Sequence, residues 1–128
     1  MATLGQYNAA EMTAQEVFDA GAAHLLEQGK QSVRLNISNM EYMCAYSSPS
    51  GLLCGAAPFI QNYSPDMEGE SWDGLIAEYG QTVDHCHLIA SLQDCHDLDC
   101  PDNWESALED IAEEHDLSTK VLENYEYA

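Results

Sequence analysis

The chain has 128 residues, 45 % of them apolar, and carries 23 Asp and Glu against three Lys and Arg, a net charge of −20. A surface of this sign repels nucleic acid and anionic lipid headgroups, so direct DNA or RNA binding and binding to a membrane surface are excluded. Disordered acidic segments are poor in aromatic residues, but Trp, Tyr and Phe recur along this chain. We therefore expect a single folded domain over residues 1–128, with 1–12 and 120–128 loose or peripheral.

The first predicted element is a helix over residues 13–28. Thr13 and Glu16 have the spacing of a capping box, and apolar residues follow at helical intervals until Gly29. The capping box fixes the start of the helix, and the glycine indicates its end.

A short β-hairpin is predicted next, over roughly residues 42–56. Its strands are the apolar runs 42–46 and 52–56, and the segment between them contains Pro and Gly, which are typical turn residues. Residues 57–70 have two prolines and little periodicity, so we expect a long loop there.

Three further helices are predicted, over residues 72–79, 83–95 and 102–115. Ser71 is the expected N-cap of the first, and Asp102 with Glu105 has the spacing of a capping box for the last. With the hairpin, the sequence predicts an α+β fold of four helices and one small antiparallel sheet.

The negative charge is concentrated in the second half of the chain, because residues 1–65 carry a net −3 and residues 66–128 a net −17. On the last predicted helix, Glu105, Glu109 and Glu113 repeat every four residues, and like charges at that spacing destabilise a helix by a few tenths of a kcal/mol per pair. A mixture of acidic and basic residues would keep the helix soluble without this cost. The exclusive use of acidic residues therefore indicates a basic partner.

The partner expected for such a surface is a basic protein that itself binds nucleic acid, on which the acidic face docks as a nucleic-acid mimic. A surface that only keeps the protein in solution, as in an acidic accessory protein without mimicry, remains the alternative. A homodimer is compatible with the sequence. The residues predicted to form the docking face are Glu68, Glu70, Asp73, Asp94, Asp97, Asp99, Asp102, Glu105, Glu109, Asp110, Glu113, Glu114 and Asp116.

A second alternative is a small metal-binding or thiol-dependent protein organised by Cys44, Cys54, Cys95 and Cys100. Zinc sites usually use paired short spacings, and no Cys-x2-Cys pair is present, so buried thiols are the preferred interpretation. We assign no catalytic residue and no cofactor and expect a protein that is not an enzyme. The odd number of cysteines and the lack of a signal sequence or an apolar run of membrane-spanning length predict a cytoplasmic protein.

Several runs carry a resemblance over roughly residues 12–118: HLLEQGKQS at 24–32, CAY at 44–46, GLLCG at 51–55, YSPDMEG at 63–69 and LQDCHD at 92–97, followed by Trp104-Glu105. In these runs the chain resembles a family of short, uncharacterised proteins of phages, prophages and their bacterial hosts. The family has no assigned activity, so the resemblance implies a phage context and no chemistry.

This chain departs from the family pattern in two ways. Residues 33–41 are longer and lack an Asp- and Gly-rich turn before the hairpin, and the C-terminal half has lost nearly all its basic residues. A scaffold that has become uniformly negative is what adaptation to a basic host target would produce. By analogy with nucleic-acid mimics among anti-restriction and anti-CRISPR proteins, we expect a phage-derived inhibitor of a host defence system that acts in the host cytosol.

Overall fold

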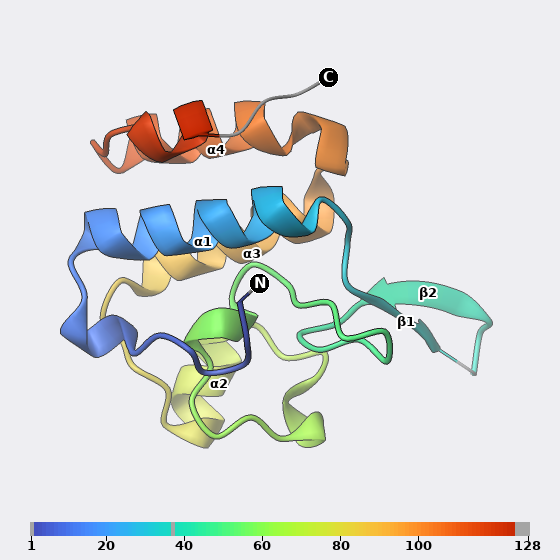
Figure 1. The fold of residues 1–128 in the computed structure, drawn as a ribbon. Helices are drawn as coiled ribbons and strands as arrows, with labels where there is room; N and C mark the ends of the chain where they lie inside the picture. Colours follow the sequence, from blue (N-terminus) through green and yellow to red (C-terminus); the bar gives the residue numbers. More distant parts are fainter. Residues whose placement is uncertain (1, 37, 125–128) are drawn as a thin grey trace.

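The structure is a computed structural model that describes residues 2–36 and 38–124. These residues form four α-helices and one two-stranded antiparallel sheet, which confirms the predicted α+β class. Three helices, α1 (Ala14–Gln28), α3 (Cys86–Leu98) and α4 (Trp104–Glu114), pack on one another, and the short α2 (Trp72–Tyr79) packs on α3 (Figure 1).

Helix α1 begins as its sequence predicts. The side chain of Thr13 accepts a hydrogen bond from the backbone N–H of Glu16, whose carboxylate accepts one from the N–H of Thr13. The helix ends at Gly29, which adopts the left-handed conformation that glycine tolerates best. Its buried face, which includes Val17, Phe18 and Leu25, packs into the core.

The packing of α3 against its neighbours depends on two glycines that contact Leu92. A Cβ atom at Gly21 of α1 would lie 2.5 Å from Cδ1 of Leu92, and one at Gly55 would lie 2.2 Å from the backbone O of Leu92. Both distances are far below van der Waals contact. Glycine at these positions therefore lets α1 and the segment around Gly55 approach α3 more closely than any side chain would permit.

The two strands differ in part from the predicted hairpin. Strand β2 (Glu41–Cys44) pairs with β1 (Val33–Asn36) and not with residues 52–56. The predicted turn is present, but beyond it the chain makes only an isolated bridge between Ser47 and Leu53. Residues 56–60 then turn into the core, where they are buried, so they leave no second strand for pairing.

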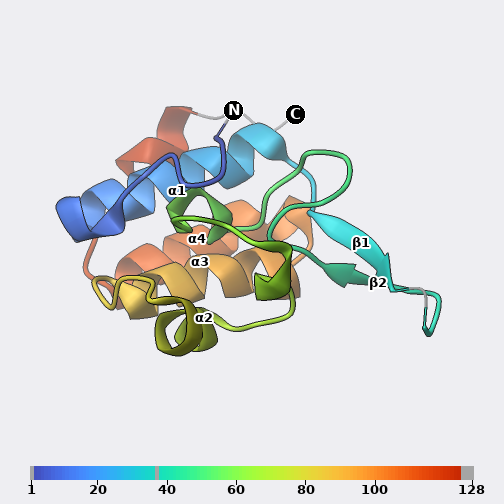
Figure 2. The same cartoon turned by 90° about the horizontal axis from the view of Figure 1, so that it is seen from below.

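The β1–β2 hairpin projects from the helical body (Figure 2). Leu35 and Tyr42 are paired across the two strands and are 40 % and 74 % exposed. The first strand thus lies within residues 33–41, for which the sequence predicts no helix or strand.

Two helix boundaries also differ from the prediction. Helix α3 starts at Cys86 because His85 has a positive φ of 59°, and it runs on to Leu98 before Asp99 becomes extended. The capping box predicted from Asp102 and Glu105 is not formed. Residues Pro101–Asn103 make a 3-10 turn, and the N-cap of α4 has no side-chain hydrogen bond.

Parts of both chain ends belong to the core and are not loose. Ala9 and Leu122 are 1 % and 3 % exposed, and the ring of Tyr7 lies 5.9 Å from that of Phe59. The predicted loop 57–70 is irregular but contains two 3-10 turns, at Ala57–Phe59 and Pro65–Met67. Residues 1 and 125–128, which the prediction included in the peripheral ends, lie outside the described residues.

Within the described ranges, no helix combines the length and the apolar character that a membrane crossing requires.

We predict that Gly55→Ala lowers the free energy of unfolding by about 2 kcal/mol or more, because the added methyl group meets the backbone of α3, which cannot move aside cheaply. Thermal or denaturant unfolding measures this. Gly74→Ala is the matched control, since its added Cβ meets only the flexible end of Glu70 and alanine favours the helix. Equal stability of the two variants would contradict the importance of the close approach at Leu92.

Candidate functional site

Two adjoining hollows lie on either side of α3. The first, which we call the acidic cavity, has a volume of about 390 Å³ and is enclosed by α2, α3, the end of β2 and the segment 68–71. The second, the helix groove, has a volume of about 430 Å³ and lies between α3 and α4. Asp94 lines both hollows, which makes them neighbours on one surface.

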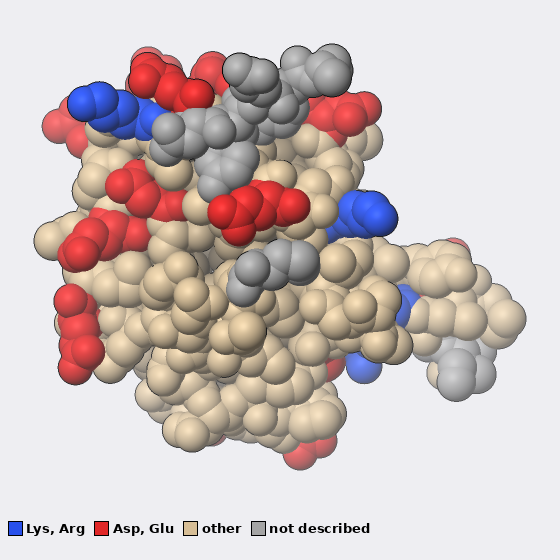
Figure 3. Space-filling model, in the orientation of Figure 1, with Lys and Arg blue, Asp and Glu red and all other residues tan. Residues whose placement is uncertain are grey.

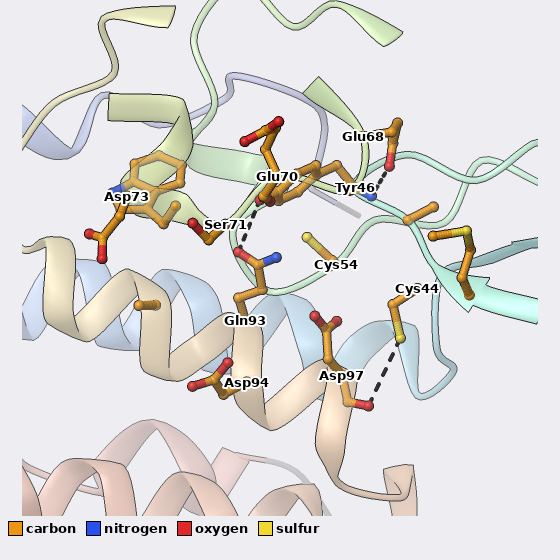
Figure 4. A pocket seen from close by; sticks show the side chains of 15 residues that line it. Cys44, Tyr46, Cys54, Glu68, Glu70, Ser71, Asp73, Gln93, Asp94 and Asp97 are labelled. Carbon is orange, nitrogen blue, oxygen red and sulfur yellow. Dashed lines mark hydrogen bonds between the residues drawn. The ribbon is translucent and has the colours of Figure 1, made fainter. Parts of the chain in front are cut away.

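The acidic cavity combines carboxylates with an apolar wall. Figure 4 shows Asp97 and Gln93 extending from α3 toward the strand and the loop, while Asp73 faces α3 from the start of α2. The apolar part of the lining includes Trp72 and Ala90. No Lys, Arg or His is among the described residues that line this cavity.

Two of these carboxylates influence each other. Burial and then the nearby negative charge of Asp97 raise the pKa of the Asp94 carboxyl above its ordinary value. Asp97 accepts a hydrogen bond of 2.6 Å on Oδ1 from Nδ1 of His96. The cavity thus holds negative charge that its own lining compensates only in part.

Glu68, which the sequence analysis placed on the docking face, has an internal role. Its carboxylate accepts hydrogen bonds from the backbone N–H groups of Tyr46 and Ser47 at 2.8 and 3.1 Å and from the hydroxyl of Tyr63 at 2.5 Å. It therefore fixes the chain where it leaves β2. In Figure 4 the side chain of Glu70 points away from α3, although its backbone O accepts a hydrogen bond from the hydroxyl of Tyr46.

The helix groove has acidic edges and an apolar floor. Asp94 from α3, Asp99 just after its end and Asp110 from α4 line it, together with Ile111 and Leu98. Leu98 is 79 % exposed, and no sequence signal distinguished it from the apolar residues of the core. A basic segment with an apolar side chain would match this combination.

The remaining predicted acids lie outside both hollows: Asp102, Glu105, Glu109, Glu113, Glu114 and Asp116. All are exposed except Glu105, which is half-buried. Because Trp104 and Leu108 turn one face of α4 to the core and Asp110 faces the groove, the row of Glu105, Glu109 and Glu113 falls on the other flank of the helix.

The acids predicted to form the docking face therefore lie partly in the two hollows and partly on the other flank of α4. Figure 3 shows acidic side chains over α4 and along α1, and the lower part of the same view is largely uncharged. The acids of the two hollows form a concave surface.

The four cysteines proposed as one metal site do not come together. Cys54 and Cys95 are buried, Cys44 is half-buried and Cys100 is exposed, and all are free thiols. Burial raises the pKa of Cys44 to about 11 and that of Cys95 to about 12, which disfavours the thiolate form that binds metals.

Among the described residues, one other group has metal-ligand geometry: one ligand atom each of Cys44, His96 and Asp97 lie within 4.8 Å of one another. The ring of His96 is already engaged on both nitrogens. Its Nε2 accepts a hydrogen bond of 2.8 Å from the backbone N–H of Ser32, so the proton resides on Nδ1 and is donated to Asp97. A metal on Nδ1 would require both hydrogen bonds to change, so this group fits a structural role better.

Three aromatic or histidine side chains lie in the core. Trp72 and Trp104 are 2 % and 0 % exposed, and Trp72 also lines the acidic cavity. His24 is 2 % exposed, and its Nε2 donates to the backbone oxygens of Leu53 and Cys54 at 3.2 and 3.1 Å. It is a packed histidine that joins α1 to the segment after the turn.

Comparison with protein-family models, with curated proteins and with solved structures found no match to this chain. The resemblance to phage-associated proteins therefore stays a prediction, and the assignment of a function depends on the surface just described.

We predict that Glu68→Gln lowers the free energy of unfolding by about 1–3 kcal/mol, because the amide cannot accept all the hydrogen bonds of the carboxylate. Denaturant unfolding at neutral pH measures the change. Glu114→Gln removes the same charge from an exposed site at the end of α4, where negative charge is unfavourable, and should alter stability by no more than about 0.5 kcal/mol. Similar losses in both variants would show that Glu68 acts only through its charge.

We predict that the protein loses stability as the pH falls below about 6.5, the ordinary pKa of histidine. Burial lowers the pKa of His24 in the folded state, so below 6.5 the unfolded chain binds a proton that the folded protein does not. Between the lowered pKa of the folded state and 6.5, the free energy of unfolding then rises by at most about 1.4 kcal/mol per pH unit. Above pH 6.5 this contribution of His24 is fully present. Unfolding curves of the wild type and of His24→Gln measure the slope, which the variant should reduce. An identical slope in both would contradict the role of His24.

Proposed function

We propose that this protein is a non-enzymatic binding protein that docks on the basic groove of a nucleic-acid-binding protein and occupies it in place of the nucleic acid. The observation that carries the proposal is the surface made by the acidic cavity and the helix groove. Carboxylates from α2, α3 and α4 converge on it, and no Lys or Arg lines either hollow within the described part of the chain.

Electrostatics supports this class of partner. A net charge of −20 makes association with acidic or neutral proteins slow and association with basic ones fast. Exposed carboxylates outside the hollows, such as Glu109 and Glu113, add to the long-range field even though they line neither hollow. They steer the encounter, and the concave surface provides the contact.

The target class that we propose is a host defence protein, such as a restriction nuclease or a CRISPR effector subunit. The support for this step is the resemblance to phage-associated proteins together with the loss of basic residues in the second half of the chain, where Lys120 is the single one left. Inhibition would follow from exclusion of the nucleic acid and would require no chemistry.

The test begins with capture of proteins from a nuclease-treated bacterial lysate on the immobilised protein at low salt. We predict that a captured target is displaced by duplex DNA or RNA, and that the affinity of the purified complex falls steeply with salt, because both partners bind through charge. A captured protein that nucleic acid does not displace, or a complex that is indifferent to salt, would contradict mimicry.

A charge variant locates the surface. Asp94→Asn, Asp99→Asn and Asp110→Asn together remove the carboxylates of the helix groove, including the one that it shares with the acidic cavity, and should slow association roughly tenfold. The matched control neutralises three exposed carboxylates that line neither hollow, Glu11, Glu41 and Glu123, and changes the net charge equally. An equal effect of both triple variants would show that only total charge matters.

A further inference from the structure

The acidic cavity differs from the rest of the acidic surface in being a walled space. It holds about 390 Å³, within the range of cavities that bind small organic groups, whereas acids such as Glu109 and Glu113 lie exposed outside both hollows. Met43 of β2 and Ala90 of α3, both half-buried, contribute apolar surface to its lining, and Trp72, which is 2 % exposed, lies behind it. Apolar surface beside carboxylates matches a ligand with an apolar stem and a charged head.

The carboxylates that line the cavity indicate that the charged group of the ligand is positive. Asp73 comes from α2, and Asp94 and Asp97 come from α3. Asp73 and Asp94 make no hydrogen bond among those found for the described residues, and Asp97 accepts one from His96 on a single oxygen. Three like charges that share one hollow repel each other, and the repulsion is larger there than in open water because the surroundings are less polar. A cation inside the cavity would relieve it.

The geometry favours guanidinium over ammonium. Asp94 and Asp97 are three residues apart on α3 and lie on the same side of the helix, so a planar fork of N–H donors can reach both carboxylates. Guanidinium is also less strongly hydrated than ammonium, which lowers the cost of entering a partly enclosed site.

We propose that the acidic cavity binds the guanidinium group of an arginine side chain, which the basic partner inserts between α2 and α3. The identity of the arginine as part of that partner rests on the proposed function, but the capacity of the cavity for guanidinium does not. The arginine would give the docked complex a fixed register, which long-range charge alone does not supply.

The direct test is titration of the full chain with N-acetyl-arginine amide at low salt, followed by NMR. We expect the amide signals of Gln93 and Asp94 and the indole N–H signal of Trp72 to shift. The indole N–H of Trp104 serves as the internal reference, because it donates to the backbone O of Asp99 and does not line the cavity. N-acetyl-citrulline amide, of the same shape without the charge, should produce no shifts.

Two variants distinguish binding inside the cavity from general attraction by the negative charge of the protein. Asp73→Asn with Asp94→Asn should weaken binding of the arginine amide roughly tenfold, as expected for loss of charge-assisted hydrogen bonds. Ala90→Leu fills the cavity without changing the charge and should weaken binding by a similar factor. Thermal unfolding of each variant verifies that the fold is retained.

The matched control is Glu11→Gln with Glu41→Gln, which changes the net charge by the same amount at exposed positions outside the cavity. It should alter the affinity for the arginine amide less than about twofold at constant salt. Equal weakening by the control and the cavity pair, shifts with the citrulline compound, or unchanged binding by Ala90→Leu would each overturn the proposal.

These experiments distinguish a failure of the arginine site from a failure of the proposed nucleic-acid mimicry. If the arginine amide binds in the cavity but no nucleic-acid-displaceable partner exists, the cavity assignment stands and the mimicry fails. If such a partner is found and binds Ala90→Leu as tightly as the wild type, the mimicry stands and the arginine assignment is overturned.

Discussion

The close packing around Leu92 is the constraint on which the rest of the structure depends. Gly21 and Gly55 reach α3 from two sides, and a single methyl group at either position would overlap the residue. Because Asp94 and Asp97 follow on the same helix, the contacts that hold Leu92 in the core also hold one wall of the acidic cavity. The opposite wall is fixed independently, since Glu68 and Tyr46 join the loop before α2 to the chain leaving β2. The two walls of the cavity are therefore held by different contacts, core packing on one side and hydrogen bonds on the other.

The acids of this chain serve different purposes that composition alone does not separate. Glu16 caps α1 and Glu68 accepts three hydrogen bonds, so both belong to the folded architecture. Glu109 and Glu113 lie exposed on α4 and contribute a field without a defined contact. The acids of the two hollows combine both properties. The helices hold them in place, but no Lys or Arg among the described residues lining the hollows neutralises their negative charge.

Local signals predicted most of the helices, and long-range contacts account for the differences. The capping box of Thr13 and Glu16 lies within one turn and was readable, whereas the predicted strand 52–56 instead runs into the core, where Leu53, Cys54 and Ala56 are buried. For the candidate site, the excess of acids between Asp94 and Asp110 lies on or next to α3 and α4, which line the helix groove. The cavity itself joins residues 43–46, 68–73 and 90–97, and no spacing in the sequence reveals that these meet.

The projecting hairpin has a consequence for how the molecule moves near a charged surface. Residues 30–44, which lead into and form it, carry Lys30 and Arg34 against the single acid Glu41, so this arm is slightly positive on a body that holds the whole negative excess. A charge distribution of this kind constitutes a large electric dipole. Close to a basic surface it experiences a torque that turns the arm outward and the body inward, so the molecule is oriented before the first atoms touch.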